Sequence, residues 1–435
     1  MRDLLCNNVS VNENGHLTFA GQDTVALAEK YGTPLYLFDE NRVRERCRTY
    51  IGAVKEAFGE RGKVLYASKA ASFKQIYRIM KDENMGIDVV SSGEICTALS
   101  ADFDLGKAYF HSNNKTDEDI AYAIENGIGY FVVDNAEELY SIDRIAKENN
   151  IVQPVLLRLT PDIDPHTFEA VSTGKVDSKF GSAIATGQAD EMVQLTISFE
   201  NIELAGFHCH IGSQVFDSDV FLKAAKVMLE FIAFVSEEYG IIIDQLDLGG
   251  GYGVRYLPEH PHIDIAKNIL TVGEYIKRKC AELNIKMPII GFEPGRSIVA
   301  DAGMTLYTVG TLKKIPEFIN YVSVDGGMTD NVRYAMYGAP YTLVQADNMN
   351  AECDMVCSVV GRCCESGDIL QTNVNLPSTI KRGNIIACLT TGAYNYSMAS
   401  NYNRIPRPPI VMLRDGDSYV AVRRETVQDL IVLDI

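Results

Sequence analysis

The sequence has no apolar run long enough to cross a membrane. Its first residues, Met1-Arg2-Asp3, do not begin a charged-then-apolar signal segment. No stretch is rich in Lys and Arg, and the net charge is −18 at pH 7. Such a charge repels nucleic acid and anionic membranes. We therefore expect a soluble, cytoplasmic protein that binds neither, although backbone N–H groups and a few arginines could still hold a small anion.

The 10 cysteines lack the spacing of metal ligands. Cys363 and Cys364 are neighbours, which is a poor geometry for a disulfide. We expect reduced thiols, their usual state in the cytosol. Internal repeats, low-complexity tracts and linkers are also absent, so we expect the domains to pack together.

The length and the hydrophobic pattern predict two domains, because 435 residues exceed what one small core usually holds. From residue 64 to about residue 300, short apolar strands alternate with helical patterns such as 136–148 and 221–239. The strands are predicted at 64–68, 87–90, 108–111, 130–133, 155–159, 204–211, 245–248 and 288–292. This is the spacing of a (β/α)8 barrel, and an open doubly wound sheet is the alternative. Only a closed barrel would place the last strand beside the first.

The segments on either side of the barrel are rich in predicted β-strands. Residues 4–20 alternate like short strands around an Asn14-Gly15 turn, and Asp23 is expected to cap a helix. A strand at 35–38 and a long amphipathic helix to about residue 58 follow. Later strands are predicted at 304–309, 321–324, 353–360, 385–389, 410–411 and 419–422. We therefore predict an α/β protein: a TIM barrel with a C-terminal antiparallel β-sandwich or β-barrel domain, to which N-terminal strands contribute. The predicted domains are 1–34, 35–300 and 301–435.

Reacting groups on such a barrel lie at the carboxyl ends of the strands. The first strand ends at Lys69 and the second carries Asp88. A strand would fix the direction of the lysine, and partial desolvation would lower the pKa of its amine towards one that attacks a carbonyl. On this segment alone, a surface lysine that closes a strand is the alternative.

Three glycines, Gly249, Gly250 and Gly251, follow the seventh strand. Glycines let backbone N–H groups approach a phosphate closely, with a helix start behind them. The GxGxxG spacing is missing and no GK[ST] follows. This disfavours a dinucleotide or a nucleoside triphosphate and favours a cofactor with a single phosphate.

His208 and His210 stand two apart on the sixth strand and therefore share a face. Three interpretations stay open for them. They could be a hydrogen-bonded core pair, a metal site completed by Asp88 and Asp247, or a stacking imidazole against a flat aromatic ligand. Lys69 would be an unusual neighbour for a metal.

The eighth strand ends in Glu293-Pro294-Gly295-Arg296. This could be a surface ion pair, or an acid held against a basic ring nitrogen with Arg296 facing an anion. An amine, a phosphate-binding turn, an imidazole and an acid together describe pyridoxal 5′-phosphate. Its aldehyde forms a Schiff base with lysine, and its ring accepts electrons while the ring nitrogen is protonated. We predict this cofactor and no metal.

The same motifs resemble those of the alanine-racemase-fold pyridoxal phosphate enzymes, and within them the diaminopimelate decarboxylase family. The resemblance covers nearly the whole chain and rests on the stretches 66–70, 177–181, 208–213, 248–251, 293–296, 325–328, 364–368 and 392–394. It implies a barrel plus a β domain, and a homodimer whose active sites lie at the subunit junction. The implied reaction converts meso-diaminopimelate to L-lysine and CO2, the last step of lysine biosynthesis.

The resemblance also implies roles for single residues. The catalytic residues would be Lys69, for the Schiff base, and Cys364, a proton donor that arrives from the partner subunit. The cofactor-binding residues would be Lys69, Asp88, His210 on the ring face, Ser213, Gly250 and Gly251 at the phosphate, Glu293 at the ring nitrogen, Gly295, Arg296 and Tyr394. The substrate contacts would be Arg296, Arg333, Tyr337, Glu365 and Tyr394.

Three positions depart from the family pattern without removing a charged or reacting group. Ala71 stands where asparagine is usual, Tyr334 where proline usually follows the arginine, and Arg362 where proline usually precedes the Cys-Cys-Glu run.

Three other functions remain as alternatives. A decarboxylase of ornithine, arginine or carboxynorspermidine would need no arginine for a second carboxylate, so Arg333 argues against it. A metal-dependent barrel hydrolase would bind zinc. A silent regulatory paralogue would be expected to lack Lys69 or Cys364, and the sequence contains both.

Overall fold

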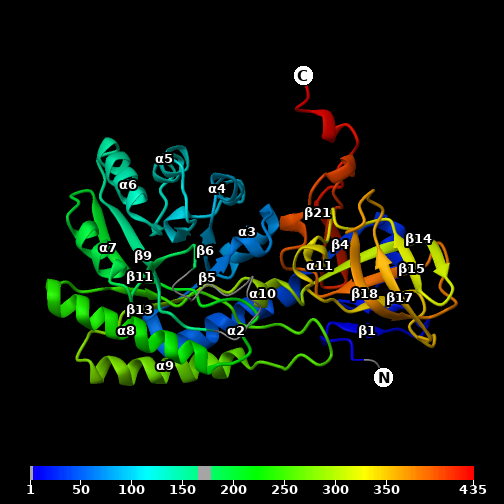
Figure 1. Cartoon of the computed structure of the whole chain (residues 1–435), viewed down its shortest axis with the longest axis horizontal. Helices are drawn as coiled ribbons and strands as arrows, with labels where there is room; N and C mark the ends of the chain where they lie inside the picture. The colour runs from blue at the N-terminus through cyan, green and yellow to red at the C-terminus, as the bar shows by residue number, and fades with distance from the viewer. Residues whose placement is uncertain (1–2, 165–177) are drawn as a thin grey trace. The chain divides into compact units, whose positions relative to one another are not determined.

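The computed structural model of the protein describes residues 3–164 and 178–435. The chain divides into two compact units. One, which we call the β unit, consists of Met1–Glu45, Val254–His262 and Ile298–Ile435. The other, the barrel unit, consists of Arg46–Gly253 and Ile263–Ser297. The elements of each unit are labelled in Figure 1.

The barrel unit is built on a closed ring of eight parallel strands. They are β5 (Gly62–Ala67), β6 (Gly86–Val89), β7 (Ala108–Phe110), β8 (Tyr130–Val133), β9 (Gln153–Thr160), β11 (Ile202–His208), β12 (Gln245–Asp247) and β13 (Ile289–Phe292). The order β9-β11-β12-β13-β5-β6-β7-β8 closes where β8 pairs with β9. Phe292 of β13 lies opposite Val64 of β5. The predicted barrel is thus confirmed, and the open sheet is excluded.

A helix follows each strand of the ring, and α3 to α9 lie around its outside (Figure 1). These helices are α3 (Lys74–Asp82), α4 (Ser92–Leu99), α5 (Asp117–Glu125), α6 (Ala136–Glu148), α7 (Gln188–Ile197), α8 (Asp219–Tyr239), α9 (Ile265–Glu282) and α10 (Arg296–Val299). In α8 the buried residues Phe221, Ala225, Met228 and Ile232 recur every three or four positions, so one apolar stripe faces the strands. A short strand, β10 (Ser182–Ala183), pairs with β9.

The β unit contains a sheet of nine strands. They are β4 (Leu35–Asp39), β14 (Gly303–Ile315), β15 (Ile319–Val324), β16 (Leu343–Gln345), β17 (Met355–Val360), β18 (Ile369–Leu376), β19 (Ile385–Leu389), β20 (Ile410–Arg414) and β21 (Asp417–Val422). The pairs β15–β17 and β4–β20 are parallel, and the others are antiparallel. The sheet is therefore mixed, which corrects the prediction of a purely antiparallel domain. Residue alternation shows which face a side chain occupies but not the direction of the neighbouring strand.

The N-terminal segment supplies strands as predicted. β1 (Val9–Val11), β2 (Leu17–Phe19) and β3 (Gln22–Asp23) form a separate three-stranded sheet, with no strand at residues 4–6. The carboxylate of Asp23 accepts the N–H of Val25 at 2.8 Å and caps α1 (Thr24–Tyr31). α2 (Glu40–Phe58) is the predicted long helix. β4, expected from the sequence in the barrel domain, instead pairs with β14 and β20 in the large sheet.

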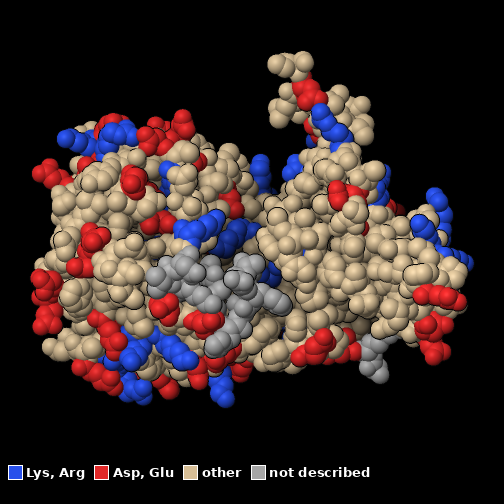
Figure 2. All heavy atoms as spheres, in the orientation of Figure 1, with Lys and Arg blue, Asp and Glu red and all other residues tan. Residues whose placement is uncertain are grey.

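The surface carries both signs of charge. On the face seen in Figure 2, acidic and basic side chains are interspersed over the helices of the barrel unit. Among the helices of the described residues, none has the length and apolar character that a membrane crossing needs.

A buried ion pair joins the loop after β7, which carries Lys115, to the first turn of α6, which carries Glu138. The ammonium of Lys115 contacts a carboxylate oxygen of Glu138 and donates to the carbonyl of Val132 at 2.8 Å. The other Glu138 oxygen accepts the N–H of Asp134 at 3.0 Å. Both charged side chains are almost completely buried. The attraction between them compensates for the hydration that each loses on burial.

We expect Lys115→Met to lower the free energy of unfolding by about 3–5 kcal/mol, because it leaves the Glu138 carboxylate buried without a counter-charge. Urea titration measures the loss. The double variant Lys115→Met, Glu138→Leu should recover most of it. As a control, Arg144→Met, which breaks the exposed contact with Asp117, should change stability by less than about 1 kcal/mol. A loss at Lys115 as small as that of the control would show that the buried pair is not needed.

Candidate active site

Lys69 lies in a single 3₁₀ turn, Ser68–Ala70, directly after β5. Its neighbours Ser68 and Ala70 are buried, whereas Lys69 itself is exposed. The strand ends at Ala67, two residues before the lysine, so the side chain leaves the packed interior at the carboxyl end of the ring. The amine is thus accessible to a ligand there.

Glu293 follows β13, and its carboxylate lies between two imidazoles. Its Oε2 is 3.0 Å from Nε2 of His208, in a hydrogen bond. Its Oε1 is 2.7 Å from Nε2 of His111, without the alignment of a hydrogen bond. All three residues are buried. Burial would raise the pKa of Glu293, but the two histidines hold it well below its usual value. A carboxylate anion is thus fixed inside the barrel.

His208 is neutral at physiological pH, because burial lowers its pKa to about 4 despite the opposing effect of Glu293. Its Nδ1 is buried and has no hydrogen-bond partner among the described residues. The ring therefore carries its proton on Nε2 and donates it to the carboxylate. Of the interpretations left open for His208, a hydrogen-bonded buried residue fits this geometry.

The metal interpretation is less well supported. In the described ranges, potential ligand atoms of His111, His208 and Glu293 lie within 4.8 Å of one another. Asp247, one of the further ligands that this interpretation needs, is buried, and both burial and Glu293 raise its pKa well above the usual value. Burial also raises the pKa of Asp88. The hydrogen bond of Glu293 to His208 and its contact with His111 account for the cluster without a metal.

The glycine turn after β12 has no room for side chains. A Cβ atom on Gly250 would lie 2.2 Å from the carbonyl oxygen of Glu293, and one on Gly251 would lie 2.2 Å from that of Gly212. The N–H of Gly250 donates to Nδ1 of His210 at 3.3 Å. Burial lowers the pKa of His210 well below its usual value, and Lys69 adds to this effect. The turn thus orients a neutral imidazole.

A hydroxyl and a guanidinium lie together in the barrel unit. Nε and Nη2 of Arg296, at the start of α10, donate to Oγ of Ser213 at 3.1 and 3.0 Å. The N–H of Val215 donates to the carbonyl of Gly251 at 2.9 Å, which joins the Ser213 loop to the glycine turn. A Cβ atom on Gly295 would lie 2.9 Å from Cβ of Ala67, so the end of β13 packs directly against β5.

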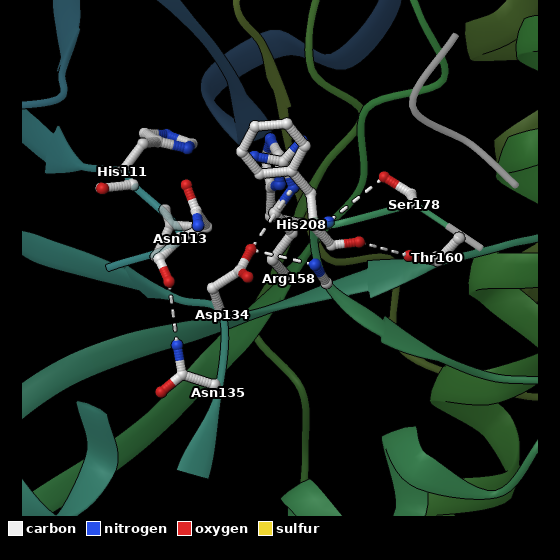
Figure 3. A network of polar contacts seen from close by, with 12 residues as sticks. His111, Asn113, Asp134, Asn135, Arg158, Thr160, Ser178 and His208 are labelled. Atoms are coloured by element: carbon white, nitrogen blue, oxygen red, sulfur yellow. Dashed lines mark hydrogen bonds and ion pairs between the residues drawn. The ribbon is translucent and has the colours of Figure 1, made fainter. Parts of the chain in front are cut away.

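Sequence reasoning missed His111, Asp134 and Arg158. The carboxylate of Asp134 accepts the N–H of Gly181 at 2.9 Å and lies 4.0 Å from the guanidinium of Arg158, as Figure 3 shows. That guanidinium is 4.4 Å from the centre of the Phe180 ring. His111 and Asp134 stand directly after β7 and β8, so the strand-end rule would have identified them. Arg158 lies inside β9, where nothing in the pattern marks it. Asp177 of the neighbouring motif lies outside the described residues.

Three of the expected substrate residues lie together in the β unit. Arg333 begins α11 (Arg333–Tyr337), and its guanidinium lies 5.0 Å from the ring centre of Tyr394 and 5.5 Å from that of Tyr337. Arg333 is buried, and its Nε has no hydrogen-bond partner among the described residues. Among the ion pairs of the described part of the chain, none involves this guanidinium, so it is available to bind the carboxylate of a ligand.

Cys364 and Glu365 are exposed on the loop between β17 and β18. The departures from the family pattern are accommodated locally. Ala71 is buried and its carbonyl accepts the hydroxyl of Tyr66 at 3.0 Å, and the hydroxyl of Tyr334 contacts that of Thr372. The N–H of Arg362 donates to the carbonyl of Gly326 at 3.1 Å, a bond that proline could not make.

Comparison with known proteins defines the class of this chain. The family model described as pyridoxal-dependent decarboxylase, pyridoxal binding domain, matches residues 41–300. The chain belongs to this family of pyridoxal-dependent decarboxylases.

Within that family, the chain belongs to the diaminopimelate decarboxylases. It is 43% identical to the diaminopimelate decarboxylase of Staphylococcus aureus (strain COL), over 98% of this chain and 99% of that protein. It is 42% identical to that of Bacillus subtilis (strain 168), over 98% of this chain and 96% of that protein. The crystal structure of the M. jannaschii diaminopimelate decarboxylase in co-complex with L-lysine has a TM-score of 0.90 and is 35% identical, covering 99% of this chain and 98% of that chain.

Pyridoxal phosphate is the cofactor of this family, as the sequence predicted, and the barrel unit fits it. The accessible amine of Lys69 and the anionic Glu293 stand at the ends of adjacent strands. The turn of Gly250 and Gly251 packs so closely against the backbones of Glu293 and Gly212 that only glycine fits there. A glycine turn after a strand can offer backbone N–H groups to a phosphate.

The lowered pKa of His208 predicts a specific pH dependence of stability. The unfolded chain takes up a proton on this histidine below about pH 6.5, whereas the folded protein does so only near pH 4. Stability should therefore fall as the pH drops from 6.5 to 4, by on the order of 3 kcal/mol from this group. Guanidinium titrations at several pH values measure it. His208→Gln, which keeps a donor towards Glu293, should lose that part of the slope; an identical slope in the variant would refute the assignment.

Proposed function

We propose that this protein catalyses the decarboxylation of meso-diaminopimelate to L-lysine and CO2, with pyridoxal phosphate carried by Lys69. The observation that carries this proposal is the adjacency of β5 and β13, which brings the amine of Lys69 and the carboxylate of Glu293 to one end of one ring. Relatives at 42–43% identity are named diaminopimelate decarboxylases. Solved relatives from M. jannaschii and Helicobacter pylori contain L-lysine, the product of this reaction.

Each cofactor group has a counterpart in the barrel unit. Lys69 would hold the aldehyde carbon, Glu293 the ring nitrogen and His210 the ring face. The phosphate would lie on Ser213 and the turn of Gly250 and Gly251. The remaining proposed contacts are Asp88, Gly295 and Arg296 of the barrel unit, and Tyr394 of the β unit. When bound, the cofactor supplies an electron sink for the bond that breaks. Glu293, kept anionic by its histidines, retains a proton on the ring nitrogen, on which that capacity depends.

The residues of the β unit match the far end of the substrate, which carries an amine and a second carboxylate. Arg333 is a buried cation without a carboxylate partner among the described residues. It suits the second carboxylate, with Arg296 as a further cation. Glu365 suits the amine, and Tyr337 and Tyr394 flank the guanidinium of Arg333. Ornithine and arginine have no second carboxylate, so a decarboxylase for them is not favoured.

Cys364 is the proposed proton donor to the carbon that CO2 leaves. Its thiol is exposed and available for proton transfer. The proposal includes a homodimer in which Cys364 and Glu365 act in the partner's site, and a cytoplasmic location. Because Lys69 and Cys364 are both present, a silent regulatory paralogue is not favoured.

Lys69→Ala should abolish the visible absorbance of the Schiff base in purified protein and reduce lysine formation by at least about a thousandfold, because no amine would hold the cofactor covalently. The exposed Lys74→Ala, at the start of α3, is the matched control and should keep both properties. Absorbance spectra and lysine analysis measure the two effects. An unchanged visible spectrum in Lys69→Ala would refute the assignment of the Schiff base.

The substrate assignment is tested by supplying meso-diaminopimelate, ornithine and arginine in parallel and measuring the products. Only meso-diaminopimelate should be consumed rapidly. Arg333→Met should lower kcat/KM for this substrate. The loss of transition-state stabilisation calculated from that ratio should be about 2–5 kcal/mol, because an ionic contact to the second carboxylate is lost. The exposed Arg382→Met should have little effect. Ornithine as the preferred substrate, or full activity in Arg333→Met, would contradict the assignment.

A further inference from the structure

The loop that carries Cys364 is held by a buried carboxylate. Asp368 is 3% exposed, and among the described residues no cationic side chain pairs with it. Its Oδ2 accepts the N–H of Cys363 at 2.7 Å, and its Oδ1 accepts the N–H of Met328 at 2.6 Å. Asp368 therefore joins two loops of the β unit, residues 325–331 and residues 361–364.

Two glycines make this arrangement possible. A Cβ atom on Gly361 would lie 2.3 Å from Oδ2 of Asp368, and one on Gly327 would lie 2.5 Å from Oδ1. Gly327 also has φ +151, which side chains rarely adopt. The two loops thus approach each other backbone to backbone on either side of the carboxylate. Asp330 supports this contact from Gly327, because its Oδ2 accepts the N–H of Gly327 at 2.9 Å.

Each residue of the 361–364 loop has an acceptor for its N–H. Gly361 donates to the carbonyl of Asp368 at 3.0 Å, and Arg362 to that of Gly326 at 3.1 Å. Cys363 donates to the Asp368 carboxylate. Cys364 donates to Oδ1 of Asn403 at 2.9 Å.

Asn403 is suited to this role, because it has φ +53 and asparagine tolerates that conformation better than most residues. Surface loops usually leave such N–H groups to water. Here the backbone is held by protein acceptors while the side chain of Cys364 is exposed. Its neighbour Cys363 differs, since burial and the adjacent Asp368 raise the pKa of that thiol to about 12. The loop therefore presents one thiol and retains the other as a structural group.

We propose that Asp368 and Asn403 are positioning residues for Cys364. Together they hold the two peptide N–H groups that precede its Cα, those of Cys363 and Cys364, so that the thiol approaches the reacting carbon from a single direction. This inference rests on the proposed function, in which Cys364 donates the proton. Neither residue touches the substrate; each acts through the Cys364 loop.

Asp368→Asn tests the inference with little change in shape. An amide cannot accept two N–H groups on its two different atoms, so one loop loses its anchor. Amide hydrogen exchange in peptides covering 361–368 should become at least about tenfold faster, measured by mass spectrometry on the cofactor-loaded protein. We expect kcat to fall about ten- to a hundredfold, since small misplacements of a catalytic group cost this much, while KM stays within about threefold.

The direction of proton delivery provides a readout that a merely structural role would not change. In D2O the carbon that loses CO2 acquires one deuterium, and the wild-type enzyme should place it with a single stereochemistry. Asp368→Asn should lower this stereochemical purity. The matched control is Asp39→Asn, another buried carboxylate of the β unit, which accepts the N–H of Arg42 at 3.0 Å. It should leave the exchange of 361–368, kcat and stereochemistry unchanged.

Asn403 offers an independent test at an exposed position, where folding is not at risk. Asn403→Ala removes the acceptor for Cys364 and should reproduce the loss in kcat and stereochemical purity. Asn403→Asp keeps both the acceptor and the tolerance of a positive φ, so it should restore wild-type behaviour.

Two results would overturn the inference. One is hydrogen exchange in 361–368 that does not change in Asp368→Asn or Asn403→Ala. The other is faster exchange with unchanged kcat and stereochemistry, which would make the anchors structural only. Failure of the proposed function itself would look different, because Cys364→Ala would then retain wild-type turnover and stereochemistry.

Discussion

The pairing of β13 with β5 is the constraint on which the barrel unit depends. It converts a sequence of β–α repeats into a ring, and a ring has one carboxyl end where residues more than 200 positions apart become neighbours. Lys69 and Glu293 come from the first and last strands of this ring. The glycine turn follows β12, the other neighbour of β13. Without closure, an amine and an acid from opposite ends of the alternating segment would have no reason to share a site.

Inside this ring, electrostatics depend on burial more than on net charge. The chain carries a net charge of −18, yet the group that matters is the single carboxylate of Glu293, which lies between His111 and His208 and whose pKa these histidines hold well below its usual value. His208, which is neutral because burial lowers its pKa, stabilises this anion by donating a hydrogen bond and adds no second full charge. The buried pair of Lys115 and Glu138 follows the opposite design, with two full charges that compensate each other. Both arrangements hold a polar group in a fixed place away from water.

Much of this could be read from the sequence because strand and helix periods leave distinct patterns. All eight ring strands were predicted within a few residues. Four of the motifs that carry the resemblance to the pyridoxal phosphate enzymes lie at the ends of these strands: 66–70, 208–213, 248–251 and 293–296. β16 and β18 were missed, and the two parallel pairings could not be foreseen, since alternation does not encode strand direction. Arg158 was missed because a charged residue inside a strand is ordinarily taken to face solvent.

The close contact between the glycine turn and the end of β13 has a consequence for how this protein can change. A side chain at Gly250 would collide with the main chain of Glu293, not with a movable side chain. Substitution there would push apart two neighbouring strands and displace the acid together with the turn. Substitution of this glycine therefore has no tolerated intermediate form. New ligand preferences are more easily acquired through the side chains of the β unit.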